Sequence, residues 1–322
     1  MMIRVYLVIL ICVGPYLASG QQLPAWSTFY ENGFIWNPAL TAKWNSWEAS
    51  ATHRREWQGF EDAPEHVTMS FQMPFLRKFT KASFGTYIEY DKVGPFTSVN
   101  LAGTYTYRIR SRLFGNRDDV LSMGFMGKFG QVRFEPKSLV AFDGLEGEIS
   151  LKEQSSSVIT PNVSIGLFYI SVSDFYSFKS HYYAGVSLNN LVPTTLIDVP
   201  LGDIRSGLHA TVHAGYRHFP RRAKHYIEPN MMIIYGFAKA INVMANVRYE
   251  ATNRFWMSAG LVSHGEVFGQ FGLIFNDRSA LKKLVKDGTL RIGIKMDYNV
   301  GNYRRLTGFG SEIYLAYLFE ME

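Results

Sequence analysis

Apolar and polar residues alternate with a period of two along most of the chain, which is typical of β-strands rather than helices. The segments with this pattern are 47–54, 65–73, 82–91, 99–109, 118–132, 161–173, 179–189, 208–217, 225–236, 240–250, 253–263, 267–276, 290–299 and 311–320. The pattern predicts about fourteen strands, an even number, each long enough for the roughly 9 to 11 residues of a tilted membrane strand.

The two faces of these strands differ in chemistry. One is apolar, with Tyr, Phe and Trp often near strand ends. The other carries small and polar residues with scattered charges, which include Glu48, Glu89, Arg108, Lys128, Glu228, Arg248, Glu250, Lys295 and Glu312. A soluble β-sandwich also alternates, but its solvated face is rich in Lys and Glu and its buried face needs no ring of aromatics. We therefore predict an all-β transmembrane antiparallel β-barrel with the charged face toward the lumen.

Glycine is frequent inside the predicted strands, which suits close packing in the lumen and strong curvature. The positions are Gly85, Gly103, Gly124, Gly166, Gly185, Gly215, Gly260, Gly272 and Gly293.

The first twenty residues have the features of a cleaved signal peptide. Arg4 supplies a positive charge, residues 6–13 are apolar, and Ala18-Ser19-Gly20 is a cleavage site of small residues. The chain's one cysteine, Cys12, lies in the apolar stretch, so the mature chain is expected to lack disulfides and thiol chemistry. The predicted divisions are a signal peptide over 1–20, an N-terminal segment over 21–45 and an outer-membrane barrel over 46–322.

Composition supports an exported membrane protein without spanning helices. Aromatic residues make up 15% of the chain and charged residues 19%. After residue 13 no apolar stretch approaches the roughly 18 to 20 residues of a spanning helix, because the best candidate, 231–247, is interrupted by Lys239, Asn242 and Asn246.

The connections between strands fall into two sets. If both ends of the barrel chain are periplasmic, short turns belong to the periplasm and long loops to the outside. The outer set contains 55–64, 135–160, 190–206 and 301–310. The periplasmic set contains 74–81, 111–117, 174–178, 219–224, 251–253 and 277–288, in which 280–286 is expected to form a short amphipathic helix.

Basic residues gather on the periplasmic set and account for the chain's net charge of +6. They are Arg77, Lys78, Lys81, Arg110, Arg112, Arg117, Arg221, Arg222, Lys224, Arg278, Lys282, Lys283 and Lys286. One hypothesis is that this rim docks an anionic periplasmic partner. The other is that it meets lipid phosphates or keeps the turns solvated, and the sequence leaves both open.

No catalytic or metal-binding constellation is apparent, so we expect neither an enzyme nor a cofactor. His209 and His213 share a strand face but lie roughly 13 Å apart. His53 and His66 flank the first outer loop and are placed to meet its acids, Glu56, Glu61, Asp62 or Glu65, without diagnostic ligand spacing. A nucleotide or nucleic-acid partner is not expected, since a phosphate loop and an aromatic stacking platform are both lacking.

Several motifs occur in an order and spacing that resemble the PorP/SprF family of the type IX secretion system of Bacteroidetes. They are Asn37-Pro38-Ala39, the stretch His53 to Pro64, the stretch His181 to Leu191, Ala214-Gly215-Tyr216-Arg217, the stretch Arg254 to Leu261, Leu290 to Gly293 with Asp297-Tyr298, and Glu312-Ile313. The resemblance covers essentially the whole mature chain. It departs from the family at Glu56, usually glutamine, at Ser311, commonly histidine, and in the residues past Phe319.

The resemblance implies an outer-membrane component of a secretion and gliding apparatus. Its expected partner is the C-terminal domain of a secreted cargo protein or a periplasmic secretion-ring protein or lipoprotein, and its surroundings are outer-membrane lipid. Arg55, Trp57 and Pro64 are the candidates for specificity, because Trp and Arg are frequent interface anchors. The alternative for Trp57 and Arg55 is the outer aromatic belt and a lipid phosphate.

Asn37 and Pro38 are also candidate partner-binding residues, and they are expected to hold the N-terminal segment as a partial plug or at the periplasmic mouth. The rival function is a passive porin or small-solute transporter, which needs an open lumen. A surface hydrolase is a weaker third alternative.

Overall fold

The computed structural model describes residues 29–44, 46–58, 63–75, 81–111, 119–135, 156–172, 178–197, 204–220, 224–236, 240–252, 254–276, 285, 288–301 and 308–319. The predicted signal peptide lies outside these residues and stays a prediction.

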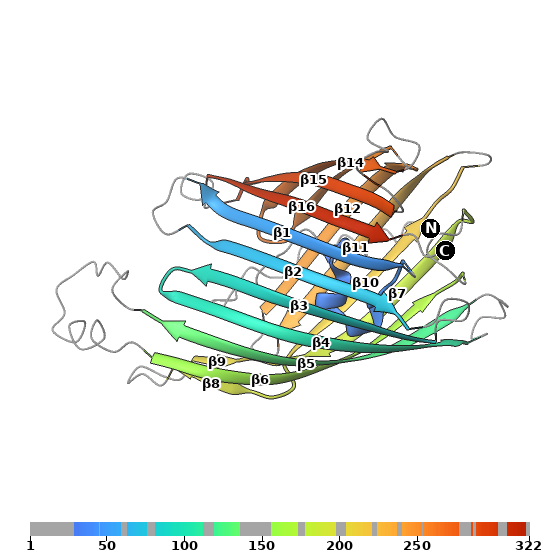
Figure 1. Ribbon diagram of the computed structural model, residues 1–322. Helices are drawn as coiled ribbons and strands as arrows, with labels where there is room; N and C mark the ends of the chain where they lie inside the picture. The colour runs from blue at the N-terminus through green and yellow to red at the C-terminus, as the bar shows by residue number, and fades with distance from the viewer. Residues whose placement is uncertain are drawn as a thin grey trace, which may run out of the picture.

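Fourteen antiparallel strands form a closed barrel (Figure 1). They are β1 (Trp47–Gln58), β2 (Glu65–Pro74), β3 (Ala82–Val93), β4 (Phe96–Arg110), β5 (Val120–Phe134), β6 (Ser156–Ile170), β7 (His181–Asn189), β10 (His209–Arg217), β11 (His225–Gly236), β12 (Ala240–Ala251), β13 (Phe255–Val262), β14 (Glu266–Phe275), β15 (Gly288–Asn299) and β16 (Phe309–Phe319). The first strand closes the barrel on the last, from Trp47 opposite Phe319 to Gln58 opposite Phe309. The predicted fold class and number of strands are confirmed.

The alternation places the apolar face outside and the polar face inside. On β4, Leu101 and Tyr105 are 57% and 48% exposed, whereas Thr104 between them is 1% exposed. Charged side chains predicted to face the lumen, such as Glu228 and Arg248, are almost completely buried. Since closure gives every wall strand two neighbours, the barrel can present this apolar belt to lipid without an open sheet edge.

We call the end of the barrel that carries Trp47 and Phe319 the periplasmic end, and the end that carries Gln58 and Phe309 the extracellular end. This assignment follows from loop length, because the longest connection, between β5 and β6, leaves the extracellular end.

Two connections differ from the sequence-based expectation. Strand β6 begins at Ser156, so the outer loop expected over 135–160 is shorter than predicted. The outer connection over 190–206 contains a two-stranded sheet of β8 (Thr194–Ile197) and β9 (Ile204–Ser206). The period-two pattern did not predict β8 and β9, because their segments are shorter than those of the wall strands. The helix expected over 280–286 lies outside the described residues except for Val285, which is buried.

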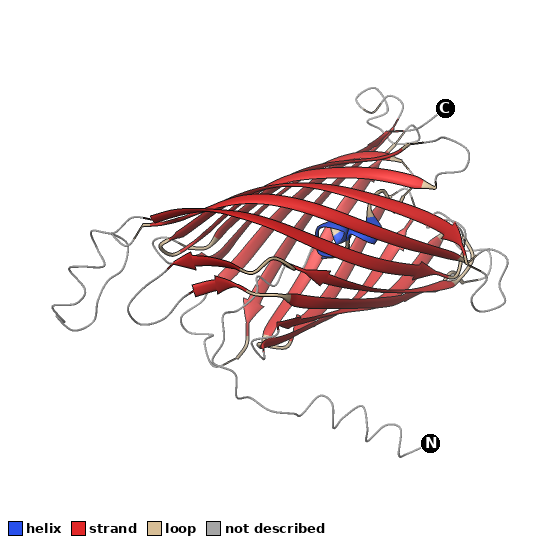
Figure 2. Cartoon of the chain, turned by 90° about the horizontal axis from the view of Figure 1, so that it is seen from below, coloured by secondary structure: helices blue, strands red, loops and turns tan. Residues whose placement is uncertain are grey.

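Two short helical elements precede the barrel strands and lie inside the barrel (Figure 2). They are the α-helix α2 (Gly33–Trp36) and the 3-10 helix η2 (Pro38–Leu40). Among the residues that the structure describes, no helix is long and apolar enough to cross a membrane.

Candidate functional site

Residues 29–44, here called the inner segment, lie within the lumen. Every residue of the inner segment is buried except Ile35 and Lys43, which are half-buried. A segment of sixteen residues with two helical turns cannot bury itself in this way, so the barrel wall supplies its surroundings.

The inner segment runs from the extracellular half of the lumen to its periplasmic end. Phe29 and Trp36 pack in one cluster with Met232, Ile234, Met244, Val262 and Phe268, which lie toward the extracellular ends of β11 to β14. At the other end, the Trp44 ring lies 5.4 Å from the guanidinium of Arg217 and 5.9 Å from that of Arg291. Both arginines belong to the periplasmic ends of their strands.

Asn37 and Pro38, the two residues expected to hold this segment, face the barrel wall. Asn37 is 0% exposed, and its amide nitrogen donates to the carbonyl oxygen of Leu167 on β6 at 3.0 Å. Its side-chain oxygen accepts from the backbone N–H of Ala39 at 2.9 Å and caps η2. Pro38 is the first residue of that helix, where its fixed φ is favourable. Their contact with a protein partner stays a prediction.

A group of ion pairs, here called the lower network, ties the inner segment to the periplasmic half of the wall. It consists of Tyr30 and Glu31 from the inner segment and Tyr183, Arg217, Glu228, Arg248, Glu250 and Arg291 from the strands.

The contacts of the lower network are short and deeply buried. Arg217 Nε lies 2.6 Å from Glu228 Oε2, and Arg248 Nη1 lies 2.6 Å from Glu31 Oε1. The hydroxyl of Tyr30 donates to Glu228 at 3.0 Å. Because buried charges are tolerated only when paired and hydrogen-bonded, these contacts attach the inner segment to the wall.

A second group, the upper network, lies in the extracellular half and contains only strand residues. It consists of Arg54, Glu56, Glu266, Lys295, Asp297 and Glu312, from β1, β14, β15 and β16. Arg54 Nε lies 2.9 Å from Glu56, and its other nitrogens lie 3.6 to 3.8 Å from three further carboxylates. Lys295 Nζ lies 2.8 Å from Asp297 and 3.1 Å from Glu266. The upper network therefore spans the seam where the barrel closes.

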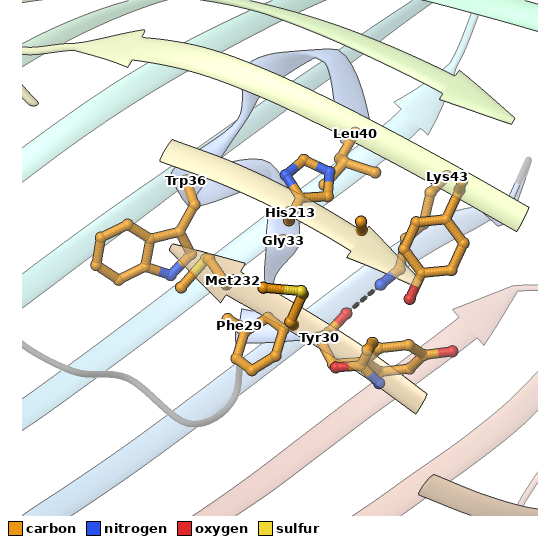
Figure 3. A pocket seen from close by; sticks show the side chains of 12 residues that line it. Phe29, Tyr30, Gly33, Trp36, Leu40, Lys43, His213 and Met232 are labelled. Atoms are coloured by element: carbon orange, nitrogen blue, oxygen red, sulfur yellow. Dashed lines mark hydrogen bonds between the residues drawn. The ribbon is translucent and has the colours of Figure 1, made fainter. Parts of the chain in front are cut away.

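A pocket lies between the inner segment and the wall near β10 and β11 (Figure 3). Phe29, Trp36 and Met232 give it apolar walls, and His213 and Asn230 add polar groups. His213 Nε2 and Asn230 Oδ1 have no hydrogen-bond partner in the described part of the chain. His209 and His213 share the lumen face, as predicted, and no cluster of three metal-ligating side chains occurs in the described residues.

Arg55, Trp57 and Pro64 come together at the extracellular rim. The register of β1 against β16 shifts between Arg55 and Gln58, which is a β-bulge. Trp57 lies in this bulge with φ of 48° and is 38% exposed. Arg55 is exposed, Pro64 is half-buried, and the Pro64 carbonyl accepts from the backbone N–H of Glu56 at 2.9 Å. A bulge redirects side chains at the rim of a barrel, and here it exposes Arg55 and Trp57.

The two rim histidines separate. His53 Nε2 lies 2.9 Å from Glu65 on the exposed outer face, one of the acids expected to meet it. His66 turns into the lumen, where its Nδ1 lies 3.4 Å from Asp91 and 4.0 Å from Glu89. These two acids come from β3 and are not among the loop acids expected from the sequence.

Among the predicted basic docking residues, Arg221, Arg222, Lys282 and Lys283 lie outside the described residues. Lys224 is described and exposed at the start of β11. Their role at the periplasmic rim stays a prediction.

Sequence reasoning missed the two networks as units. Alternation placed Arg248 and Glu250 of the lower network on the lumen face. In the upper network, Arg54 and Glu312 meet only because the register of β1 against β16 places them opposite each other. No pattern marked Tyr30 or Glu31, because the inner segment lacks a regular period.

The closed barrel, its apolar outer belt and its charged lumen define an outer-membrane β-barrel protein. Solved structures of similar fold belong to the same class. They include the CymD monoaromatic hydrocarbon channel, with a TM-score of 0.54, 10% identity and coverage of 90% of this chain and 92% of that one. The toluene transporter TodX of Pseudomonas putida has a TM-score of 0.53, 9% identity and coverage of 90% and 94%. A FadL homologue of Pseudomonas aeruginosa has a TM-score of 0.50, 10% identity and coverage of 96% and 97%.

These identities show a shared fold and nothing more specific. No curated protein matches the chain. The family model "Type IX secretion system membrane protein PorP/SprF" matches residues 18–317, and the chain therefore belongs to the PorP/SprF family. The protein is an outer-membrane component of the type IX secretion system, and its family and fold point to a secretion component or channel rather than an enzyme.

Proposed function

We propose that this barrel works by protein recognition and binds either the C-terminal domain of a secreted cargo protein or a periplasmic ring component. The observation that carries the proposal is the filled lumen, because the inner segment occupies the space that a solute would need. A barrel closed by its own chain serves as an anchor for a partner more readily than as a pore.

The two ends of the barrel suit different partners. The extracellular rim displays Arg55 and Trp57 on a bulge, which suits retention of a cargo domain at the cell surface. The periplasmic turns carry the basic residues Arg221, Arg222 and Lys224, which suit an anionic ring component. In this proposal the apolar outer belt contacts lipid and anchors the barrel in the outer membrane, so that each end faces its own compartment.

The test is a mild-detergent pull-down of the tagged protein from its own outer membrane, with mass spectrometry of the proteins that accompany it. We expect a large secreted protein or a periplasmic ring component in near-stoichiometric amount. A barrel that purifies alone overturns the proposal and favours a passive porin, for which a filled lumen is unfavourable.

Two sets of variants assign the partner to one end. Trp57→Ala with Arg55→Ala removes a cargo bound at the rim, and Trp47→Ala, an exposed tryptophan at the periplasmic end, is the matched control. Charge reversal to Glu at Arg221, Arg222 and Lys224 removes a ring component, with Arg133→Glu at the extracellular end as its control. If the charge reversal leaves all partners bound, docking at these turns is wrong.

A further inference from the structure

Three glycines from neighbouring strands form a strip on the lumen wall. Gly124 on β5 lies directly opposite Gly166 on β6, and Gly185 on β7 lies opposite Phe168, two residues further along β6. The side of the strip that faces the lumen is covered by Asn37, Pro38 and Ala39 of the inner segment.

The glycines of the strip leave no room for a side chain between the wall and these three residues. A Cβ atom at Gly124 would lie 2.2 Å from Ala39 N and 2.3 Å from Pro38 C. At Gly166 it would lie 2.0 Å from Asn37 Oδ1. At Gly185 it would lie 2.4 Å from Cε1 of the wall residue His213 and 2.9 Å from Asn37 Nδ2. Backbone and a short amide cannot move aside as a long side chain does, so even alanine at Gly124 or Gly166 displaces the turn.

Asn37 forms hydrogen bonds with the backbone of the wall. Its amide nitrogen donates to Leu167 O at 3.0 Å on β6 and to Val186 O at 3.4 Å on β7, while its oxygen caps η2. Only an amide side chain offers two donors and an acceptor within this short reach. Leucine would leave these carbonyls unsatisfied and would crowd Gly166.

Side chains of the wall satisfy the backbone carbonyls on both sides of the turn. Ser187 Oγ and Asn189 Nδ2 donate to Trp36 O at 2.7 and 3.1 Å. Thr106 Oγ1 donates to Pro38 O, and Arg108 Nη2 donates to Ala42 O at 2.7 Å. The described inner segment shares no ladder with a strand, so its attachment consists of separate side-chain contacts.

Such an attachment differs from the wall in how it can break. The wall is a continuous ladder that opens cooperatively, whereas α2 and η2 are too short to persist once they leave the strip. Release of the whole inner segment from the lumen therefore requires the contacts of the turn and those of Tyr30 and Glu31 with the lower network to break.

We propose that the strip formed by Gly124, Gly166 and Gly185 is a docking site for the Asn37-Pro38-Ala39 turn, and that the seated inner segment is a releasable plug. The lumen is closed while the turn is seated and open once it has left. The proposal is independent of which protein the barrel binds, so failure of the pull-down leaves it unaffected.

The first test is conductance of the full-length protein in planar lipid bilayers. Wild type is expected to be closed for most of the recording. Gly166→Ala and Asn37→Leu are expected to raise the open fraction by roughly tenfold or more, because each removes the amide contacts of the turn. Gly127→Ala on β5 is the matched control, since a Cβ there meets nothing within 4 Å. Wild-type conductance equal to that of both variants overturns the proposal.

Peptide rescue separates release of the plug from a damaged wall. A synthetic peptide of residues 29–44 is expected to close Asn37→Leu channels, whereas the same peptide with leucine at position 37 does not. Gly166→Ala channels stay open with either peptide, because their docking site is obstructed. A shift of the unheated band in gel electrophoresis verifies that each barrel is folded. Folded variants that remain closed overturn the proposal.

A chemical readout checks the same step without current. The sequence beyond the predicted signal peptide contains no cysteine, so Leu40→Cys introduces a unique thiol at a position 7% exposed. We expect slow maleimide labelling in the otherwise wild-type chain and at least tenfold faster labelling when Asn37→Leu is added. Equal labelling rates in the two proteins contradict a releasable plug.

Discussion

The lower and upper networks are built from the same kinds of side chain but depend on different parts of the chain. The lower network includes Tyr30 and Glu31, so it is complete only while the inner segment is in the lumen. The upper network draws all of its members from β1, β14, β15 and β16. Charge pairs in one lumen therefore serve two purposes, attachment of an occupant and closure of the wall.

The charge balance within each network agrees with this division. In the upper network two cations, Arg54 and Lys295, face four carboxylates, so each cation is shared among several strands. In the lower network three arginines face Glu31, Glu228 and Glu250, one carboxylate of which belongs to the inner segment. Loss of the inner segment leaves Arg248 with Glu250 alone, and Glu250 is already shared with Arg291.

The largest expected effect is at Arg54, which is 3% exposed. Arg54→Leu leaves Lys295, which forms ion pairs with Glu266 and Asp297, as the one cation of the upper network for four carboxylates. We therefore expect a loss of about 3–5 kcal/mol in the free energy of unfolding. Urea titration in detergent, followed by tryptophan fluorescence, measures it. Conductance of the barrels that remain folded is expected to match wild type, since the four carboxylates paired with Arg54 all belong to wall strands. An unchanged unfolding midpoint would show that the upper network does not hold the seam.

A smaller effect is expected at Glu31, where the substitution should affect the seating of the inner segment and not the stability of the wall. Glu31→Gln removes one of the two carboxylates of Arg248, and we expect it to weaken seating of the inner segment by about 1–2 kcal/mol. Faster labelling of Leu40→Cys reports this loss, while the urea midpoint of the barrel stays near that of wild type. Glu135→Gln, whose ion pair with Arg133 is 60% exposed on both sides, is the control without effect. A loss of barrel stability as large as that of Arg54→Leu would make the inner segment part of the wall.

The wall and its occupant also differ in how far sequence predicts them. Period-two alternation located all fourteen wall strands, because each strand separates lipid from lumen on its own and needs no knowledge of its neighbours. The glycines were visible within the strands, but the strip of Gly124, Gly166 and Gly185 exists only through the register of β5, β6 and β7. The inner segment has no period, so its aromatic residues indicated that it packs on something but not where. The position of the inner segment depends on side chains from several strands that only the closed barrel brings together.

The same limit applies to Trp57, which sequence selected as an anchor without indicating its conformation. A non-glycine residue at φ of 48° is strained, and a bulge at a barrel rim is a usual place for such strain.

The smallest expected effect on stability is therefore at this position. Trp57→Gly relieves the left-handed strain while it removes the contacts of the indole, so we expect the free energy of unfolding to change by no more than about 1 kcal/mol. Neither network includes Trp57, and conductance and Leu40→Cys labelling should remain as in wild type. Retention of the partner in the pull-down is the sensitive measurement, and its loss in a fully stable barrel would assign Trp57 to recognition. Retention as in wild type would instead place the indole in the aromatic belt, where it contacts lipid and the strain serves only to turn the strand.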